Sequence, residues 1–230
     1  MYKKKSILVV VLARGGSKTI KNKNLVKIKK IPLVGLVGKL VKKMKIIDKA
    51  LVSTDSDRIG KTSQKYGLDY IFKRPKNISG NIVSDFKVLE HALKTTEKIL
   101  RRRFDIIISL PPTSPLRDKN YIEKGIKKLI KNKFDSLWTV SKTDTKFHPE
   151  KQLILKKNKL NYFHRNGPSI IARQQLSDMY HRNGVAYIMT RDCILKKKKL
   201  LTNNSGYLII NKKQISIDTF EDLNNVRKLI

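Results

Sequence analysis

Cysteine and acidic residues are both scarce in this 230-residue chain. Its single cysteine, Cys193, excludes an internal disulfide framework and a cysteine-based metal site. A chain without disulfides suits a reducing compartment, so we expect a cytoplasmic protein. No apolar run approaches the roughly 20 residues that span a bilayer, so we expect no membrane partner. The basic residues 3–5 followed by the apolar residues 7–13 resemble a signal peptide. Because Arg14 and two glycines stand where a cleavage site would lie, a buried first strand explains this run better.

The shortage of acids leaves 18 Asp and Glu against 52 Lys and Arg, for a net charge of +34. A charge of this size suits a polyanion, and nucleic-acid binding is one interpretation. The lysines, however, are scattered through every segment, and the chain has no zinc-finger spacing or RNP-type motif. We therefore do not expect nucleic acid as the main partner. An anionic substrate such as a nucleotide triphosphate fits the same charge.

Strand and helix patterns alternate over the first 140 residues. Apolar, β-branched runs predict strands at 6–12, 50–53, 70–72, 105–110 and 136–140. Capping residues and helical periodicity predict helices at about 32–44, from the caps at 54–57 to 67, after Ser84, and at 120–132. This alternation is typical of a doubly wound, mostly parallel α/β sheet.

The pattern changes after residue 140. Residues 152–155 and 160–163 predict a β-hairpin around a Lys-Lys-Asn-Lys turn, and strands are expected at 185–189 and 207–210. An amphipathic helix is predicted over 220–230. We expect a single domain over 1–230 with a small β-hairpin lobe at about 141–182.

The loop after the first strand combines glycines with cations. Its backbone N–H groups, Arg14 and Lys18, followed by Lys21 and Lys23, can cradle a triphosphate. The loop matches neither the dinucleotide fingerprint nor a Walker A motif. Because ligands bind beyond the carboxyl ends of strands in such sheets, this loop is the first candidate for a site.

Several motifs in order resemble those of one family, the acylneuraminate cytidylyltransferases. A-R-G-G-S-K-T-I at 13–20 with K-N at 23–24 is similar to the family signature A-R-x-x-S-K-x-I-x-x-K-N. Further matches along essentially the whole chain are V-S-T-D-S at 52–56, R-P at 74–75, L-P-P-T-S-P-L-R at 110–117, H-P-x-K at 148–151, R-Q-Q at 173–175, N-G at 183–184 and I-D-T at 217–219.

The resemblance implies a nucleotide-diphospho-sugar transferase-like, Rossmann-type fold and a reaction. In this family the anomeric hydroxyl of an acidic nonulosonic sugar attacks the α-phosphate of CTP, and pyrophosphate leaves. The CMP-sugar serves surface-glycan biosynthesis. The resemblance also implies a homodimer whose hairpin arms reach into the partner's site.

The resemblance assigns roles to individual positions. The catalytic set that it implies is Arg14, Lys18, Lys23 and Asp218. The nucleotide-binding set is Leu12, Ala13, Arg14, Gly15, Ser17, Lys18, Asn24, Arg74, Pro111 and Thr113. The sugar-binding set is Lys151, Arg173, Gln174, Gln175 and Asn183, with Lys151 and Arg173 meeting the sugar's carboxylate.

The metal motif departs from the family. Where the family shows D-x-D ligating Mg²⁺, this chain has Ser216-Ile217-Asp218. Alternate residues of an extended segment face the same side, and Mg²⁺ needs only one or two carboxylates. We therefore expect Asp218, with Ser216 beside it, to form a weaker but functional Mg²⁺ site.

Other departures leave alternatives open. Pro111 replaces a Gln of some members, Asn81 a frequent Asp, and His181-Arg182 a typical Arg-Pro pair, so the identity of the sugar stays open. The alternatives are a cytidylyltransferase for another acidic sugar such as an octulosonate, a catalytically weak homologue, and a basic nucleic-acid-binding protein on this fold.

Overall fold

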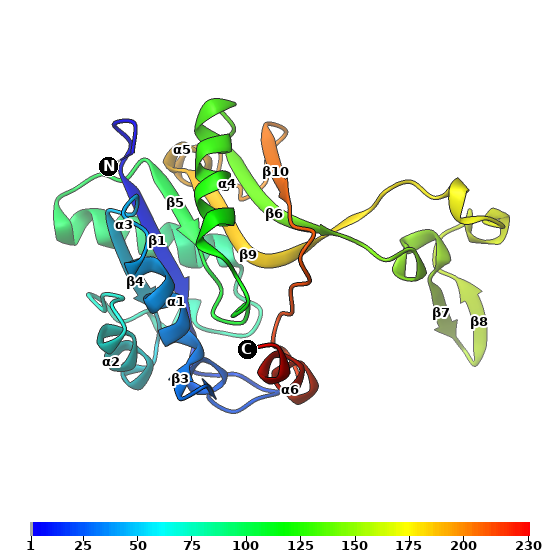
Figure 1. The fold of residues 1–230 in the computed structure, drawn as a ribbon, viewed down its shortest axis with the longest axis horizontal. Helices are drawn as coiled ribbons and strands as arrows, with labels where there is room; N and C mark the ends of the chain where they lie inside the picture. The colour runs from blue at the N-terminus through cyan, green and yellow to red at the C-terminus, as the bar shows by residue number, and fades with distance from the viewer. Residues whose placement is uncertain (1) are drawn as a thin grey trace.

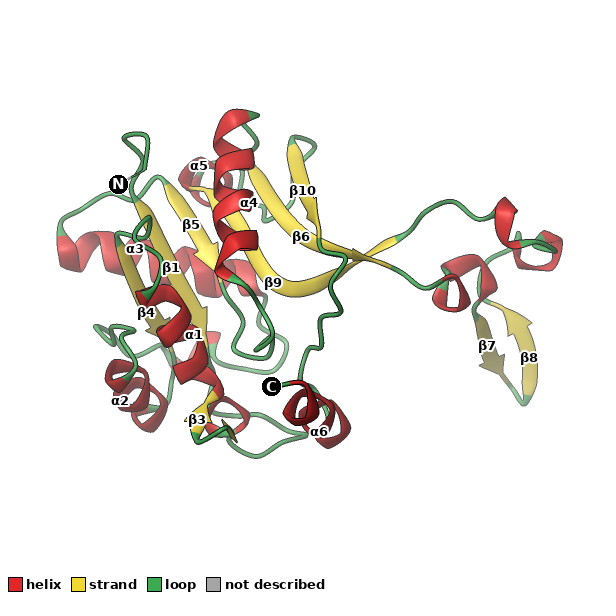
Figure 2. Cartoon of the chain, in the orientation of Figure 1, coloured by secondary structure: helices red, strands yellow, loops and turns green. Residues whose placement is uncertain are grey.

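The computed structural model describes residues 2–230, and a six-stranded sheet forms its centre (Figures 1 and 2). The strand order is β10-β6-β9-β5-β1-β4. Strands β4, β1 and β5 are parallel, β9 runs antiparallel between β5 and β6, and β10 is parallel to β6. The sheet consists of β1 (Ile7–Leu12), β4 (Lys49–Ser53), β5 (Ile106–Ser109), β6 (Ser136–Lys142), β9 (Tyr180–Thr190) and β10 (Ser205–Ile209). The predicted mostly parallel α/β sheet is confirmed.

Helices cover both faces of this sheet because its central strand is apolar on both faces. Ile7, Val9 and Val11 of β1 pack with residues of α1 and α4, whereas Leu8 and Val10 pack with residues of α3 and α5. Burying each such side chain contributes about 1.5–3 kcal/mol relative to its exposed state. The helices are α1 (Leu33–Lys42), α2 (Asp57–Lys65), α3 (Asp85–Leu100), α4 (Lys119–Lys131), α5 (Arg191–Leu195) and α6 (Phe220–Leu229).

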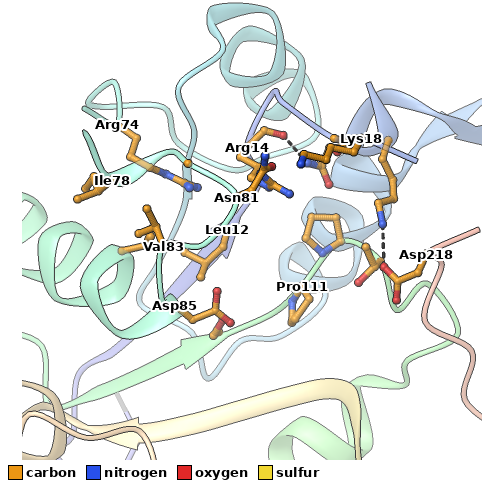
Figure 3. Close-up of a pocket in the computed structure, with 18 of the residues that line it drawn as sticks. Leu12, Arg14, Lys18, Arg74, Ile78, Asn81, Val83, Asp85, Pro111 and Asp218 are labelled. Atoms are coloured by element: carbon orange, nitrogen blue, oxygen red, sulfur yellow. Dashed lines mark hydrogen bonds and ion pairs between the residues drawn. The ribbon is translucent and has the colours of Figure 1, made fainter. Parts of the chain in front are cut away.

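Hydroxyl caps fix where two of these helices begin. The Oγ of Ser84 accepts from the backbone N–H of Lys87, as the sequence predicts, and the Oγ of Ser56 accepts from that of Ile59. Thus α3 begins at Asp85 and α2 begins at Asp57. The N-terminus of α3 lies beside the carboxyl ends of β1 and β5, where the site is expected (Figure 3).

One predicted strand is absent, one helix was not predicted, and one strand begins earlier than predicted. In place of the strand expected at 70–72, the structure has a single β-bridge between Leu51 and Asp69. The side chains that follow this bridge pack against neighbouring helices. Tyr70 lies against Gly60 of α2, where a Cβ would meet its ring, and Phe72 meets the ring of His91 edge-on. The sequence also gave no expectation of α5, whose five residues are too few to show helical periodicity. Strand β9 extends well before the predicted 185–189.

The C-terminal helix returns to the loop after β1. Leu223 and Val226 of α6 pack with Ile20, Ile28 and Leu33, beside the two-stranded ribbon of β2 (Lys27–Ile28) and β3 (Ile31–Pro32). This packing fixes the preceding segment, which contains Asp218, next to the loop. Within residues 2–230, no helix has the length and hydropathy that a membrane span requires.

The predicted hairpin is present and projects from the body of the molecule. Strands β7 (Leu153–Lys156) and β8 (Lys159–Tyr162) pair antiparallel, at the far end of a lobe that β6 enters and β9 leaves (Figure 1). We call residues 143–179 the lobe. Several of its large apolar side chains are exposed, among them Leu155 at 80% and Ile171 at 91%.

Candidate active site

The loop after β1 is held open by its neighbours. The backbone N–H of Gly15 donates to Oδ1 of Asp55 at 2.8 Å, and the amide of Asn24 donates to the carbonyl of Arg14 at 2.9 Å. A Cβ on Gly15 would lie 3.2 Å from the Cβ of Ser56, so the loop packs closely against the end of β4. Arg14 also donates from Nη1 to the side-chain oxygen of Asn81. The loop is therefore a fixed feature rather than a free turn.

Lys23 and Asp218 form an ion pair across the chain. The Nζ of Lys23 lies 2.8 Å from Oδ1 of Asp218 and donates to the carbonyl of Ile217 at 2.9 Å. The Asp218 side chain is 70% exposed, whereas that of Lys23 is 15% exposed. A cation predicted to meet phosphate and the predicted metal ligand thus lie together at one side of the site.

Arg74 is buried at the end of β4. Its Nε donates to Oγ of Ser53 at 3.1 Å, its Nη2 donates to the carbonyl of Ser53, and its backbone N–H donates to the carbonyl of Thr54. Burial lowers the pKa of Arg74 to about 10, against the charges of Asp55 and Asp85, which raise it. Its guanidinium is therefore positioned before any ligand arrives.

The loop after β5 forms another wall. Buried Arg117 donates from Nη2 to the carbonyls of Pro111 and Gly184, which ties this loop to β9. Burial lowers the pKa of Arg117 to about 9. The C-terminal segment is tied to the same loop, because the N–H of Ile217 donates to the carbonyl of Thr113 and Oγ of Ser216 lies 3.4 Å from Oγ1 of Thr113.

These parts enclose a cleft of about 520 Å³ beyond the carboxyl ends of β1 and β5 (Figure 3). Most of the sequence-predicted catalytic and nucleotide-binding residues line it, namely Leu12, Arg14, Ser17, Lys18, Lys23, Asn24, Arg74, Pro111, Thr113 and Asp218. Ala13 is fully buried and Gly15 faces Asp55, so neither is among the lining residues. Ser216 borders the cleft through Thr113.

The structure adds lining residues that the sequence did not single out, among them Ile78, Val83, Asp85 and Ser109. Desolvation raises the pKa of Asp85, whereas the charges of Arg182 and Arg74 lower it. Its place directly after the cap Ser84, at the start of a helix that begins beside a strand end, was the available signal.

The predicted sugar-binding residues are separated from the cleft. Lys151, Arg173, Gln174 and Gln175 lie on the lobe (Figure 1). Arg173 lines a second cavity, of about 570 Å³, with Lys142 and Asp178. The side-chain oxygen of Gln175 accepts from the N–H groups of Ile171 and Ala172, so it holds its own turn.

Asn183 lies at the base of the lobe, in β9. Its side-chain oxygen accepts from Oγ1 of Thr139 at 2.7 Å and from the N–H of Val185, and its amide donates to Oγ of Ser141. The side chain is buried and holds together a strand irregularity. Its predicted contact with the sugar stays a prediction.

The cleft suits a divalent cation that enters already bound to the phosphates of a substrate. Among residues 2–230 no cluster of three or more His, Cys, Asp or Glu could hold a metal. Asp218 offers one exposed carboxylate, with the hydroxyl of Ser216 two residues before it. Mg²⁺ is commonly bound through one or two carboxylates and substrate phosphates, so this donor set fits a phosphate-bound Mg²⁺.

The chain is similar to known proteins over nearly its whole length. The chain is 29% identical to the post-translational flagellin modification protein B of Campylobacter coli, over 97% of this chain and 94% of that protein. It is 28% identical, with the same coverage, to the CMP-N,N'-diacetyllegionaminic acid synthase of Campylobacter jejuni. Identity to the pseudaminic acid cytidylyltransferase of that species is 26%, over 94% of this chain and 92% of that protein.

The fold has solved relatives. A CMP:2-keto-3-deoxy-manno-octonic acid synthetase in complex with CTP superposes with a TM-score of 0.74 at 16% identity, over 97% of this chain and 98% of that one. The 4-diphosphocytidyl-2C-methyl-D-erythritol synthase of Anaerococcus prevotii superposes with a TM-score of 0.65 at 15% identity, over 98% of both chains. At these identities the likeness concerns the fold alone. The sequence profile described as Cytidylyltransferase matches residues 8–229, almost the whole chain, and the protein therefore belongs to the cytidylyltransferase family.

Proposed function

We propose that this protein transfers CMP from CTP to the anomeric hydroxyl of an acidic nonulosonic sugar and releases pyrophosphate, in surface-glycan biosynthesis. The observation that carries the proposal is the cleft, which is lined by four cations, Arg14, Lys18, Lys23 and Arg74, and by Asp218. Four cations at the carboxyl end of a parallel sheet suit a triphosphate. The relatives named for legionaminic and pseudaminic acids match this chain over nearly their whole length, which supports the sugar class.

The chain's own residues would act by positioning and neutralising charge. Arg14, Lys18 and Lys23 would bind the phosphates, while Arg74 and Asn24 would hold the cytidine against the loop after β5. The anomeric oxygen forms a bond to the α-phosphorus, the bond to the β-phosphate oxygen breaks, and the hydroxyl proton is released. Cations aimed at the leaving pyrophosphate lower this barrier, because the negative charge that develops there is stabilised.

Asp218, with Ser216 beside it, would hold the Mg²⁺ of the nucleotide. Bound there, the ion would offset the charge of the triphosphate and of the leaving pyrophosphate. The Lys23–Asp218 pair keeps both side chains at the phosphate end of the cleft before the nucleotide binds.

The lobe supports a homodimer. Lys151, Arg173, Gln174 and Gln175 lie on the lobe and apart from their own cleft, so we propose that they contact the sugar in the partner's cleft (Figure 1). Exposed Leu153, Leu155 and Leu160 on the hairpin offer an apolar surface that a second copy would cover. We also propose that residues 1–230 form a single domain, of which residues 141–182, approximately, form the dimerisation and sugar-binding part.

Light scattering after size exclusion tests this arrangement. Leu155→Lys with Leu160→Lys should give a monomer that still binds CTP and loses sugar turnover. The matched control, Lys156→Leu with Lys159→Leu on the same hairpin, should stay dimeric. A monomeric wild type with full activity would overturn the dimer.

Pyrophosphate release from CTP and Mg²⁺ tests the reaction. A panel should contain legionaminic, pseudaminic and N-acetylneuraminic acids with one octulosonate. Turnover with a nonulosonic acid is expected, and turnover with the octulosonate alone would replace the sugar class. CTP binding without release would indicate a catalytically weak homologue. Absence of CTP binding, with salt-sensitive binding of DNA or RNA, would overturn the proposal.

A further inference from the structure

Asp85, the first residue of α3, lies at the meeting point of two cavities. It lines the large cleft. It also lines a small neighbouring cavity, together with Leu89, Ser109, Trp138, Arg182, Tyr187 and Leu200. Figure 3 shows its carboxylate pointing into the cleft, on the side of Leu12 and away from Asp218. Asp85 therefore stands between the part of the cleft that suits the nucleotide and the space beside β6 and β9.

The carboxylate of Asp85 has no partner of its own. Across residues 2–230, no hydrogen bond or ion pair involves it. Asp57 occupies the same local position, directly after a serine cap at the start of α2, yet it accepts hydrogen bonds from Tyr70 and Lys73. The side chain of Asp85 is thus not occupied in holding its surroundings, and both of its oxygens are available to a ligand.

The proposed reaction leaves one proton that needs an acceptor. Among the described residues that line the cleft, only Asp85 and Asp218 carry a side chain that can accept a proton near neutral pH. Asp218 is paired with Lys23 at 2.8 Å, and the proposed Mg²⁺ would occupy it further. None of the four histidines of the chain is among the lining residues. Asp85 is therefore the uncommitted base of the cleft.

The surroundings of Asp85 favour proton transfer to it. Desolvation raises the pKa of Asp85, whereas the charges of Arg182 and Arg74 lower it without outweighing the desolvation. These two arginines, from β9 and from the segment after β4, and Tyr187 of β9 are the titratable groups that face it, and its cavity neighbours on β5 and β6 are uncharged. A carboxylate with a raised pKa is a stronger proton acceptor once it is ionised.

We propose that Asp85 is the general base of this reaction and accepts the proton of the sugar's anomeric hydroxyl. This inference rests on the proposed function. The O–H bond breaks while the oxygen forms its bond to the α-phosphorus, and the proton moves to a carboxylate oxygen of Asp85. The bond from the α-phosphorus to the bridging oxygen breaks, and pyrophosphate leaves with that electron pair. Asp85 then returns the proton to water, because the residue is exposed in the open cleft.

Single-turnover rates with CTP, Mg²⁺ and the preferred sugar test the assignment. Asp85→Asn, which keeps the size of the side chain, should lower the rate by about 10²–10³ with the Kd for CTP nearly unchanged. This range is the lower part of what a general base contributes, because a loose transition state at phosphorus demands little deprotonation. Asp57→Asn is the matched control, since it changes the same position of a capped helix outside the cleft.

The pH dependence of the same rate supplies a second readout. Only the ionised carboxylate accepts a proton, so the wild-type rate should rise with pH through the pKa of Asp85 and then level off. Asp85→Asn should lose this acidic limb, whereas Asp57→Asn should retain it. A purely structural role of Asp85 would leave the shape of the profile unchanged.

Formate supplies a third readout. In Asp85→Ala the carboxylate is removed and space is left in its place, so added formate should raise the rate in proportion to its concentration. Formate should have no effect on the wild type or on Asp85→Asn, in which the same space is filled. Binding of CTP by each variant shows that the cleft is folded.

Three results would overturn the assignment while the wild type still turns over the sugar. They are a wild-type rate in Asp85→Asn, an acidic limb that persists in this variant, and an Asp85→Ala variant that binds CTP but does not respond to formate. A wild type that turns over no acidic sugar would instead overturn the proposed function, and the assignment of its base with it.

Discussion

Introducing a second carboxylate at position 216, in place of Ser216, should tighten the binding of Mg²⁺ by this enzyme. Asp218 lines the cleft, and Oγ of Ser216 lies 3.4 Å from Oγ1 of Thr113, which lines it too, whereas Ile217 between them is buried. In Ser216→Asp the nucleotide-bound Mg²⁺ would meet two carboxylates rather than one. The expected result is half-maximal activity at a lower Mg²⁺ concentration.

The size of the effect follows from the exposure of the site. Unit charges 4 Å apart interact by about 4 kcal/mol at an effective dielectric constant of roughly 20. The 70% exposure of Asp218 indicates strong screening, and Lys23 would share its charge between two carboxylates. A net gain of about 1–2 kcal/mol remains, which corresponds to about a 5- to 30-fold lower half-saturating Mg²⁺ concentration.

The assay is pyrophosphate release at saturating CTP and sugar over a series of Mg²⁺ concentrations. Ser216→Asn is the matched control, because it has nearly the size of aspartate without its charge, and it should leave the Mg²⁺ dependence unchanged. The same half-saturating concentration in Ser216→Asp and wild type would refute the placement of the metal at Asp218. A shift of equal size in the asparagine variant would show an effect of side-chain volume.

Three further predictions concern residues of the cleft and of the strand beside it. Lys23→Met should lower kcat/KM for pyrophosphate release by about 10²–10³, because the cation proposed to stabilise the leaving group is lost while most of the side-chain length is kept; an unchanged value contradicts this. Gly184→Ala should destabilise the fold by at least about 1–2 kcal/mol in urea, because its φ is 70° and the new Cβ would meet Oγ of Ser114, whereas Gly16→Ala meets nothing within 4 Å. The raised pKa of Asp85 means that the native state holds this proton more tightly than the unfolded chain, so its stabilising effect is present at acidic pH and lost as pH rises through that pKa. Asp85→Asn should therefore gain stability relative to wild type at pH 7 compared with pH 3, and an equal difference at both values in urea unfolding would count against this.

The sequence was informative where local chemistry decides the structure. The β-branched run of β1 and the cap at Ser84 predicted a buried strand and the start of a helix, and both are present. The strand predicted at 70–72 failed because packing of Tyr70 and Phe72 against helices outweighs their strand propensity. Such packing depends on partners that a single segment does not reveal.

The site was predictable as a set of residues but not as an arrangement. Motif resemblance selected Lys23 and Asp218, yet their ion pair joins positions 195 residues apart, which no local pattern encodes. Asp85 escaped notice because an acid after a helix cap is ordinary helix chemistry. Its place in the cleft follows from where α3 begins relative to β5.

The lobe also has a consequence for how this enzyme can change. The backbone N–H of Thr143 donates to the carbonyl of Met179 at 2.8 Å, and β6 pairs with β9 on the body side of this bond. The whole lobe therefore replaces the turn of an ordinary β-hairpin. Because the chain leaves and re-enters the sheet at one point, insertions, deletions or exchange of the lobe between relatives should disturb the sheet and the cleft little.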